Sequence, residues 1–268
     1  MSITTFIVDA FTDKAFTGNP AAVCLLDVPQ ETQWMQAVAA EMNLSETAFI
    51  VVPQPQDASQ VYLLRWFTPK IEVDLCGHAT LASAHVLWYE RGDQTQVLAF
   101  QTKSGLLYAS KVSHGIELDF PARPAQPVVV PQELVAALGV EPIQVAKNAQ
   151  HYLIELANEE AVRKLTPDFD ALSRIRSARG FIVTARAVSG IYDFVSRFFA
   201  PAAGINEDPV TGVAHCCLAP WWGTVLGKNE LIAYQASPRG GVLRLRQTGS
   251  RVALTGTAVT VLKGELYV

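Results

Sequence analysis

Several features that mark large protein classes are scarce or missing in this sequence. It has four cysteines, at positions 24, 76, 216 and 217, and none forms a Cys-x-x-Cys pair. A disulfide framework and a zinc knuckle are therefore not expected. Charged residues make up 17% of the chain and the net charge is −4. The basic surface on which nucleic-acid binding depends is missing.

Long apolar runs are missing as well. No stretch of about 18 apolar residues occurs that would cross a membrane. The N-terminal segment has no basic region, and Asp9 interrupts its apolar residues, so it does not resemble a signal peptide. We expect a cytoplasmic protein that binds neither nucleic acid nor a membrane.

Hydrophobic residues are abundant, at 50% of 268 positions, and suffice for packed cores. An internal repeat favours two domains over one. Residues 49–51 (Phe-Ile-Val) recur at 181–183, and residues 65–69 (Arg-Trp-Phe-Thr-Pro) recur at 197–201 as Arg-Phe-Phe-Ala-Pro, both 132 positions later. We expect two similar halves, with a site in the cleft between them.

The same offset pairs residues with possible chemistry. It places Cys76 opposite Asp208, so two reactive side chains could face one substrate from opposite sides. Glu46 falls on Ala178, which has no reactive group. The repeat therefore predicts a duplicated scaffold whose chemistry is asymmetric.

The pattern of elements predicts an α+β fold. Strand-like runs surround residues 78–90, which are apolar on most of the helix circumference and therefore belong inside a core. We predict that each half is a curved, mostly antiparallel sheet or barrel around a central apolar helix. In the second half this helix follows Asp208 and Pro209, and Pro220 should end or kink it.

The domain boundaries follow from proline content. Residues 121–131 contain prolines at 121, 124, 127 and 131 and are predicted to be a stiff linker. Residues 1–120 form the first repeat and residues 132–268 the second. The last strand of the second repeat could pack back on the first half.

One candidate site lies at Cys76, Gly77 and His78, where a loop turns into the buried helix. The N–H groups and positive dipole at a helix start suit a substrate carboxylate, and a glycine lets the backbone approach a ligand closely. His78 could relay a proton or hold a substrate oxygen. The alternative is a glycine turn with a buried thiol and a capping histidine.

The matching place in the second half contains Asp208, Pro209, Thr211 and Gly212. Asp208 suits a helix N-cap and Pro209 the first helical turn. A capping role and a catalytic role for Asp208 are compatible, and both remain open.

Glu46 lies between Ser45 and Thr47 at the entrance of an apolar strand. Partial burial there would raise a carboxyl pKa toward neutrality, as a general acid/base needs. The alternative is a solvated glutamate without a role. Asn19 is a turn residue by default, and the polar cluster at residues 148–151 could line the cleft with it.

A metal site is not expected. Asp74, Cys76, His78 and His85 supply suitable ligand types, but their spacing fits no usual zinc pattern.

Five segments together resemble the phenazine-biosynthesis PhzF-like family, which shares its fold with diaminopimelate epimerase and proline racemase. The resemblance covers essentially the whole chain. The segments are 18–23 (Gly-Asn-Pro-Ala-Ala-Val), 45–49 (Ser-Glu-Thr-Ala-Phe), 67–69 (Phe-Thr-Pro), 76–80 (Cys-Gly-His-Ala-Thr) and 207–212 (Glu-Asp-Pro-Val-Thr-Gly).

This resemblance implies a cofactor-independent isomerase that moves a proton on a small carboxylate-bearing substrate. Glu46 resembles the family's general acid/base, and His78 and Asp208 resemble its helpers. The backbone at Gly77–His78 and around Thr211–Gly212 resembles a cradle for the carboxylate. Residues expected to contact substrate are Asn19, Ser45, Cys76, Gly77, Thr211 and Gly212. Members of the family are commonly homodimers.

One position departs from the family pattern. Val213 follows Gly212 where the family usually has serine, so a hydroxyl that could bind substrate is lost. Two alternatives to the isomerase remain. One is a racemase or epimerase that uses Cys76 and Asp208 as opposed groups. The other is an inactive module that binds a small molecule or a protein, and Val213 alone favours it.

Overall fold

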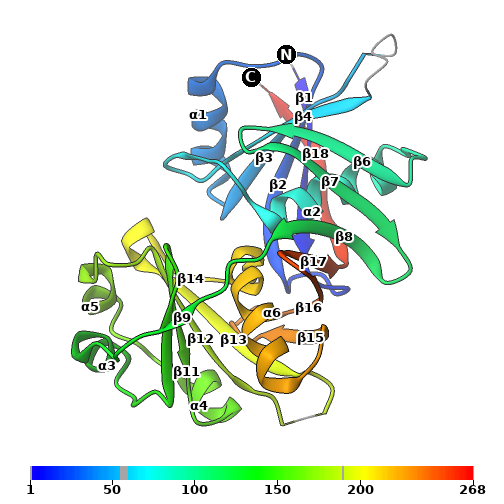
Figure 1. Ribbon diagram of the computed structural model, residues 1–268. Coiled ribbons are helices and arrows are strands. Elements are labelled where there is room, and N and C mark those ends of the chain that lie inside the picture. Colours follow the sequence, from blue (N-terminus) through cyan, green and yellow to red (C-terminus); the bar gives the residue numbers. More distant parts are fainter. Residues whose placement is uncertain (1, 55–59, 189, 268) are drawn as a thin grey trace. The chain divides into compact units, whose positions relative to one another are not determined.

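The chain folds into two compact units that both mix strands with helices, as the α+β prediction requires. The structure is a computed structural model that describes residues 2–54, 60–188 and 190–267. One unit comprises Met1–Asp119 with Thr255–Val268, and the other comprises Phe120–Leu254 (Figure 1).

The first unit is built mainly of strands, with one surface helix and one central helix. Its elements are β1 (Ser2–Ala10), β2 (Asn19–Leu26), α1 (Thr32–Met42), β3 (Glu46–Val51), β4 (Val61–Phe67), β5 (Glu72–Val73), α2 (Gly77–His85) with a π-helical extension (Val86–Glu90), β6 (Val97–Thr102), β7 (Gly105–Val112), β8 (Gly115–Pro121) and β18 (Ala258–Tyr267).

The second unit has the same kinds of elements. They are β9 (Gln126–Pro127), α3 (Gln132–Leu138), β10 (Gln144–Lys147), β11 (His151–Glu155), α4 (Glu159–Lys164), α5 (Phe169–Arg174), β12 (Gly180–Arg186), β13 (Phe194–Ala200), a 3-10 turn (Pro201–Ala203), β14 (Ile205–Asp208), α6 (Gly212–Leu226), β15 (Glu230–Gln235), β16 (Gly241–Thr248) and β17 (Arg251–Gly256).

Strand pairing follows one order in both units. In the first unit β2 and β3 are parallel, β3 and β4 antiparallel, β4 and β5 antiparallel, β4 and β6 parallel, and β6 and β7 antiparallel. In the second unit the pairs β11–β12, β12–β13, β13–β14, β13–β15 and β15–β16 have the same orientations in the same order. The sequence repeat therefore corresponds to a repeat of topology.

The predicted linker and the C-terminal segment each contain a strand that pairs with another strand. β9, within residues 121–131, pairs antiparallel with β10. β18 pairs antiparallel along the whole of β1, which also pairs antiparallel with β2. The C-terminal strand thus belongs to the first unit.

Both units have a buried helix, which confirms the prediction made from its apolar circumference. Every residue of α2 from His78 to Ala84 is buried, and α2 contacts β1, β2, β3, β7 and β18. In the second unit α6 contacts β15 and β16, and Trp222 on α6 donates from its indole nitrogen to Thr184 on β12. Each helix therefore fills the centre of its unit.

Pro220 does not end α6, which continues to Leu226. Of the two predicted outcomes at this proline, an end or a kink, the end does not occur. A proline lacks one donor, but the burial of Trp222 on the following turn stabilises the continued helix.

Within the described ranges no helix combines the length and the hydropathy that a membrane crossing needs.

Candidate active site

In the first unit the N-terminal residues of two strands bring polar side chains together. Asn19 begins β2 and Glu46 begins β3. These strands are parallel, with Ala21 opposite Glu46, so their N-terminal ends lie at one edge of the sheet. Asn19 is fully buried, and the Glu46 side chain is 15% exposed.

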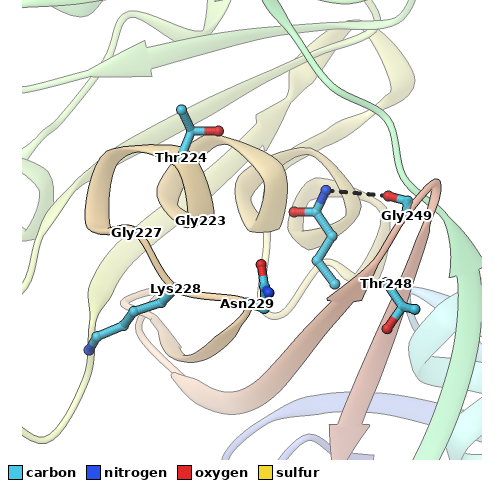
Figure 2. Close-up of a pocket in the computed structure, with 8 residues that line it drawn as sticks. Gly223, Thr224, Gly227, Lys228, Asn229, Thr248 and Gly249 are labelled. Carbon is cyan, nitrogen blue, oxygen red and sulfur yellow. Dashed lines mark hydrogen bonds between the residues drawn. The ribbon is translucent and has the colours of Figure 1, made fainter.

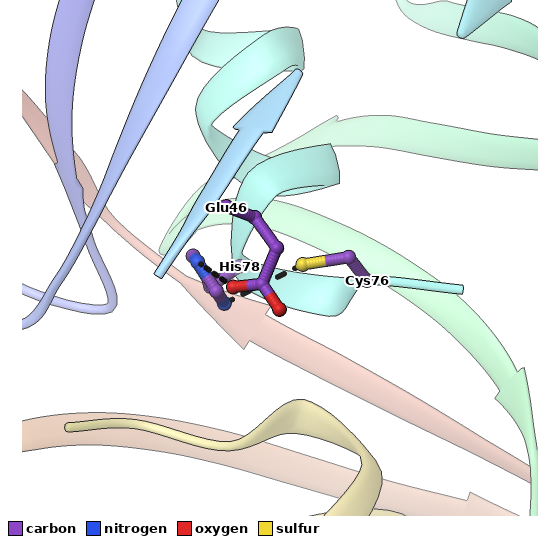
Figure 3. A group of neighbouring side chains, drawn as sticks. All are labelled: Glu46, Cys76 and His78. Carbon is purple, nitrogen blue, oxygen red and sulfur yellow. Dashed lines mark hydrogen bonds and ion pairs between the residues drawn. The ribbon is translucent and has the colours of Figure 1, made fainter. Parts of the chain in front are cut away.

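His78, the second residue of α2, contacts both of these side chains. Its Nε2 lies 3.2 Å from Oε2 of Glu46, and its Nδ1 lies 3.2 Å from Nδ2 of Asn19. Sγ of Cys76, the N-cap of α2, lies 3.6 Å from the same Nδ1. Figure 3 shows Glu46, Cys76 and His78 pointing toward one another, so three residues of the predicted site form one cluster.

The contacts of His78 determine where its proton lies. An amide nitrogen only donates, so Nδ1 accepts the hydrogen bond from Asn19. The proton of the neutral ring is then on Nε2, which lies 3.2 Å from Oε2 of Glu46 but makes no hydrogen bond to any described residue. This assignment places a neutral N–H beside the carboxylate of Glu46.

Burial lowers the pKa of His78 to about 3. The nearby carboxylate of Glu46 acts in the opposite direction, but the ring is almost completely enclosed, and desolvation opposes its charged form. His78 is therefore neutral at physiological pH.

The cluster also contains three types of metal ligand. Oxygen of Glu46, sulfur of Cys76 and nitrogen of His78 all lie within 4.8 Å of one another. However, the sulfur lies at Nδ1 and the carboxylate at Nε2, and the lone pairs of these nitrogens diverge. The two ring nitrogens thus face different neighbours, Cys76 at Nδ1 and Glu46 at Nε2.

His85 and Asp74 do not join this cluster. His85 hydrogen-bonds through Nε2 to Thr260 at 3.1 Å, and the backbone oxygen of Asp74 accepts a hydrogen bond from Ser104 at 2.7 Å. His85 is thus a structural histidine.

In the second unit Asp208 is not the N-cap of the core helix, and that prediction is wrong. Asp208 is the last residue of β14, opposite Phe198, and α6 begins at Gly212 with Thr211 as its N-cap. Pro209 accordingly lies before the helix rather than in its first turn. The hydroxyl of Thr211 donates to Oδ2 of Asp208 at 2.5 Å, so the two residues still act as a pair.

The physical reason is a buried amide that the sequence did not reveal. Gln235, at the end of β15, donates from Nε2 to the backbone oxygen of Asp208 at 2.7 Å and accepts at Oε1 from the backbone nitrogen of Thr211 at 2.8 Å. These bonds fix Asp208 and the extended Thr211 before the helix, so the helix starts only at Gly212. Because the Thr211 N–H is taken, it does not serve a carboxylate cradle.

Two arginine–glutamate pairs identify equivalent positions in the two units. Arg65 binds Glu72 through two nitrogens at 2.7 and 2.9 Å, and Arg197 binds Glu207 at 2.7 and 2.8 Å. Each guanidinium also lies over the ring two residues later, 5.2 Å from the centre of Phe67 in the first unit and 4.9 Å from the centre of Phe199 in the second.

In each unit the core helix begins at the same distance along the chain from the glutamate of its arginine–glutamate pair. Gly77 comes five residues after Glu72, and Gly212 comes five residues after Glu207. The N-cap Cys76 therefore corresponds to Thr211, and the pairing of Cys76 with Asp208 by the 132-residue offset is corrected. Three extra residues in the second unit, before α6, account for the difference.

The counterpart of Glu46 also changes. Thr47 pairs with Phe67 in the first unit, and Phe181 pairs with Phe199 in the second. Glu46 therefore corresponds to Gly180 rather than to Ala178. A Cβ at Gly180 would lie 2.4 Å from the ring of Phe198, so no side chain fits there without a shift.

The remaining predicted residues lie next to these groups, at the start of α6, or in the turn before β11. Ser45 and Gly77 are partly buried next to Glu46 and His78, and Gly212 is buried at the start of α6. In the polar cluster at residues 148–151, Oδ1 of Asn148 accepts from the backbone nitrogens of Gln150 and His151. That cluster forms a side-chain-stabilised turn before β11.

A hollow in the second unit does not coincide with any of these residues. Figure 2 shows it at the C-terminal end of α6 and the tip of the β16–β17 hairpin. Its volume is about 650 Å³, and it is lined by Gly223, Thr224, Gly227, Lys228, Asn229, Gln247, Thr248 and Gly249. Thr211 lies at the other end of this helix of 15 residues, about 22 Å along the axis.

Comparison with known proteins places the chain in one family. The family model described as phenazine biosynthesis-like protein matches residues 8–264. An uncharacterized isomerase of Halalkalibacterium halodurans is 54% identical over 269 residues, which cover 99% of each chain.

Solved structures agree with this assignment. A phenazine biosynthesis protein of the PhzF family from Enterococcus faecalis superposes with a TM-score of 0.94 at 45% identity, over 100% of both chains. A hydroxyproline epimerase from Agrobacterium vitis has a TM-score of 0.64 at 9% identity, over 99% of this chain and 92% of the other. The second likeness shows a shared fold and nothing about activity.

Proposed function

The chain belongs to the phenazine biosynthesis-like (PhzF) family, and from this premise we propose that it is an isomerase that moves a proton within a small carboxylate-bearing substrate. The observation that carries the proposal is the contact of 3.2 Å between Glu46 and the buried, neutral His78. A relative with 54% identity is named an isomerase, which supports the same class of reaction.

In the proposed reaction Glu46 is the general base and then the general acid. Its carboxylate takes a proton from a carbon next to an unsaturated or carboxylate-bearing group, and the C–H electron pair shifts into the conjugated system. The protonated Glu46 then returns the proton to another carbon of the same molecule. No net oxidation or reduction occurs, so the cycle needs no cofactor.

His78 and Asn19 orient the base. Asn19 holds Nδ1 of His78, which keeps the Nε2 atom 3.2 Å from Oε2 of Glu46. The neutral N–H next to the carboxylate stabilises its negative charge electrostatically. N–H groups at the start of α2 would bind the substrate carboxylate. We propose that Asp208 and Thr211 serve the same substrate.

Solvent-deuterium incorporation tests this proposal. A panel of small carboxylates, including a dihydro-hydroxyanthranilate, is incubated with the protein in D₂O and followed by mass spectrometry. Glu46→Gln should lower the exchange rate by about 10²–10⁴-fold. Glu41→Gln, an exposed acid on α1, is the matched control and should keep the wild-type rate. Full activity of Glu46→Gln would exclude this role for Glu46.

The racemase alternative is less well supported by the structure. It requires a reactive group that corresponds to Cys76 in the second unit, but Thr211 is the corresponding residue, its hydroxyl is a poor base, and Asp208 lies on a different element. Cys76 would have to be essential in a racemase, whereas the proposed isomerase works without a thiol.

Assembly and location belong to the proposal as well. We propose a cytoplasmic homodimer, on the basis of the family resemblance. The two units are proposed to descend from one duplicated unit, because both contain the same strand orientations and the same arginine–glutamate pair. Sedimentation velocity would show whether the particle has the mass of two chains.

A further inference from the structure

Gln235 is the most completely bonded polar side chain near Asp208. It is fully buried at the end of β15. Besides its bonds to the backbone of Asp208 and Thr211, its Nε2 lies 3.2 Å from Oγ1 of Thr211. An amide with all these contacts inside a protein has a defined orientation, because Nε2 faces only acceptors and Oε1 faces an N–H donor.

This orientation determines the direction of the Thr211 hydroxyl. Nε2 of Gln235 can only donate, so Oγ1 of Thr211 accepts from it. The single proton of the hydroxyl is then directed to Oδ2 of Asp208, 2.5 Å away. A chain of donors therefore runs from Gln235 through Thr211 to the carboxylate.

The first unit shares the backbone around this chain, but Val73 and Cys76 stand there at the positions of Asp208 and Thr211. A hairpin serine donates to the loop before the core helix in both units, from Ser104 to the oxygen of Asp74 and from Ser237 to the oxygen of Pro209. The strand register places Thr102 at the position of Gln235. The hydroxyl of Thr102 donates to Gly105 in its own hairpin. The amide is thus an addition to a shared scaffold.

We propose that Gln235 is a positioning residue that keeps the Thr211 hydroxyl directed at Asp208 and so holds Asp208 as an oriented carboxylate. The inference rests on the proposed function for its catalytic consequence, but its structural part stands on the hydrogen bonds alone. All of these bonds are made by the side chain of Gln235. Two substitutions of similar size, Gln235→Leu and Gln235→Glu, therefore test its role as a donor.

The first test is the titration of Asp208, followed by carbon NMR of the carboxyl group in selectively labelled protein. Gln235→Leu removes the amide, and Gln235→Glu replaces the donor by an acceptor that competes for the Thr211 proton. Both should raise the titration midpoint of Asp208, and Thr211→Val should raise it similarly. Gln247→Leu, whose amide bonds the backbone of Gly249 in a hairpin, is the control and should leave it unchanged.

The second test uses the isomerase rate. Gln235→Leu should lower kcat by about tenfold to a hundredfold, with KM within about threefold of wild type. If the amide acts through Thr211, the double variant with Thr211→Val should lose little more than Thr211→Val alone. Thermal unfolding of each variant separates a loss of folded protein from a loss of rate.

The outcomes separate this inference from the proposed function. An unchanged Asp208 midpoint in folded Gln235→Leu and Gln235→Glu would overturn the role of Gln235, whatever the activity. Full activity of Glu46→Gln would instead overturn the proposed function, and the titration would still decide the positioning of Asp208. If the Gln235 variants fail to fold, Thr211→Val alone must raise the midpoint, and an unchanged value there rejects the inference.

Discussion

The two core helices begin alike and differ in the chemistry around their first turn. In both units a glycine starts the helix five residues after a glutamate that binds an arginine. In the first unit the next position is His78, which meets Glu46, whereas in the second it is Val213, and Gly180 stands in place of Glu46. The duplicated scaffold thus keeps its backbone supports and assigns the acid/base pair to one copy.

This difference also explains why position 213 is a valine. It corresponds to His78, and its apolar side chain needs no hydrogen-bond partner, while the ring of Phe198 fills the space that a side chain at Gly180 would need. The second unit instead has its polar groups one turn earlier, at Asp208 and Thr211. The following predictions test this comparison, beginning with the largest expected effect.

Replacing the paired arginine should lower the free energy of unfolding more in the second unit (Arg197) than in the first (Arg65). Arg197 is 10% exposed in its side chain and also donates to the backbone oxygens of Val162 and Leu165, whereas Arg65 is 31% exposed. Arg197→Met leaves Glu207 uncompensated and should lower the free energy of unfolding by about 3–5 kcal/mol. Arg65→Met should lower it by about 1 kcal/mol. Equal losses in urea denaturation would contradict the ranking.

Acid should destabilise the protein through buried histidines, of which the second unit has two. Burial lowers the pKa of His151 and of His215 to about 4. Between about pH 6.5 and 4 the unfolded chain binds protons that the folded chain does not, so stability falls as pH falls through this window. The loss is a few kcal/mol per histidine at most.

Urea denaturation at pH 7.5 and pH 5 measures this loss. His215→Gln should reduce the pH dependence by close to one proton, while His114→Gln, at an exposed site, should not change it. A pH dependence of His215→Gln equal to that of wild type would show that His215 titrates normally.

Gly180 offers a test of the position that corresponds to Glu46. Gly180→Ala places a Cβ against the ring of Phe198 and should destabilise the protein by about 1–3 kcal/mol. Phe198→Leu in the same chain should recover part of that loss, because it removes the clashing ring atoms. Thermal unfolding of the single and double variants would give additive losses if the ring were not responsible.

The smallest effect is expected where the first unit is made more like the second. Cys76→Thr gives both core helices the same N-cap residue. Because the thiol is not the proposed base, we expect isomerase activity within about threefold of wild type and stability within about 1 kcal/mol. Loss of deuterium incorporation in this variant would favour thiol chemistry.

Much of the scaffold was predictable from periodicity. The apolar circumference of residues 78–90 indicated a buried helix, and short apolar runs indicated the strands around it. The clustering of Glu46 with His78 was expected only from the family resemblance, since nothing in the spacing of 32 residues requires contact.

The register between the units was not predictable from the offset. A constant offset of 132 assumes equal loop lengths. However, Glu207 comes ten residues after its partner Arg197, whereas Glu72 comes only seven residues after Arg65. Gln235 carried no signal either, because an amide at a strand end is common and its three partners lie 24 and 27 residues away.

The sequence by itself determined that residues 78–90 form a buried helix among strands, that two segments recur 132 residues apart, and which residues carry reactive groups, because these depend on local periodicity and residue type. Only the tertiary structure decided that Thr211 corresponds to Cys76, that His78 is neutral beside Glu46, and that Gln235 directs the Thr211 hydroxyl to Asp208. These depend on strand register, burial and hydrogen-bond direction between residues distant in sequence.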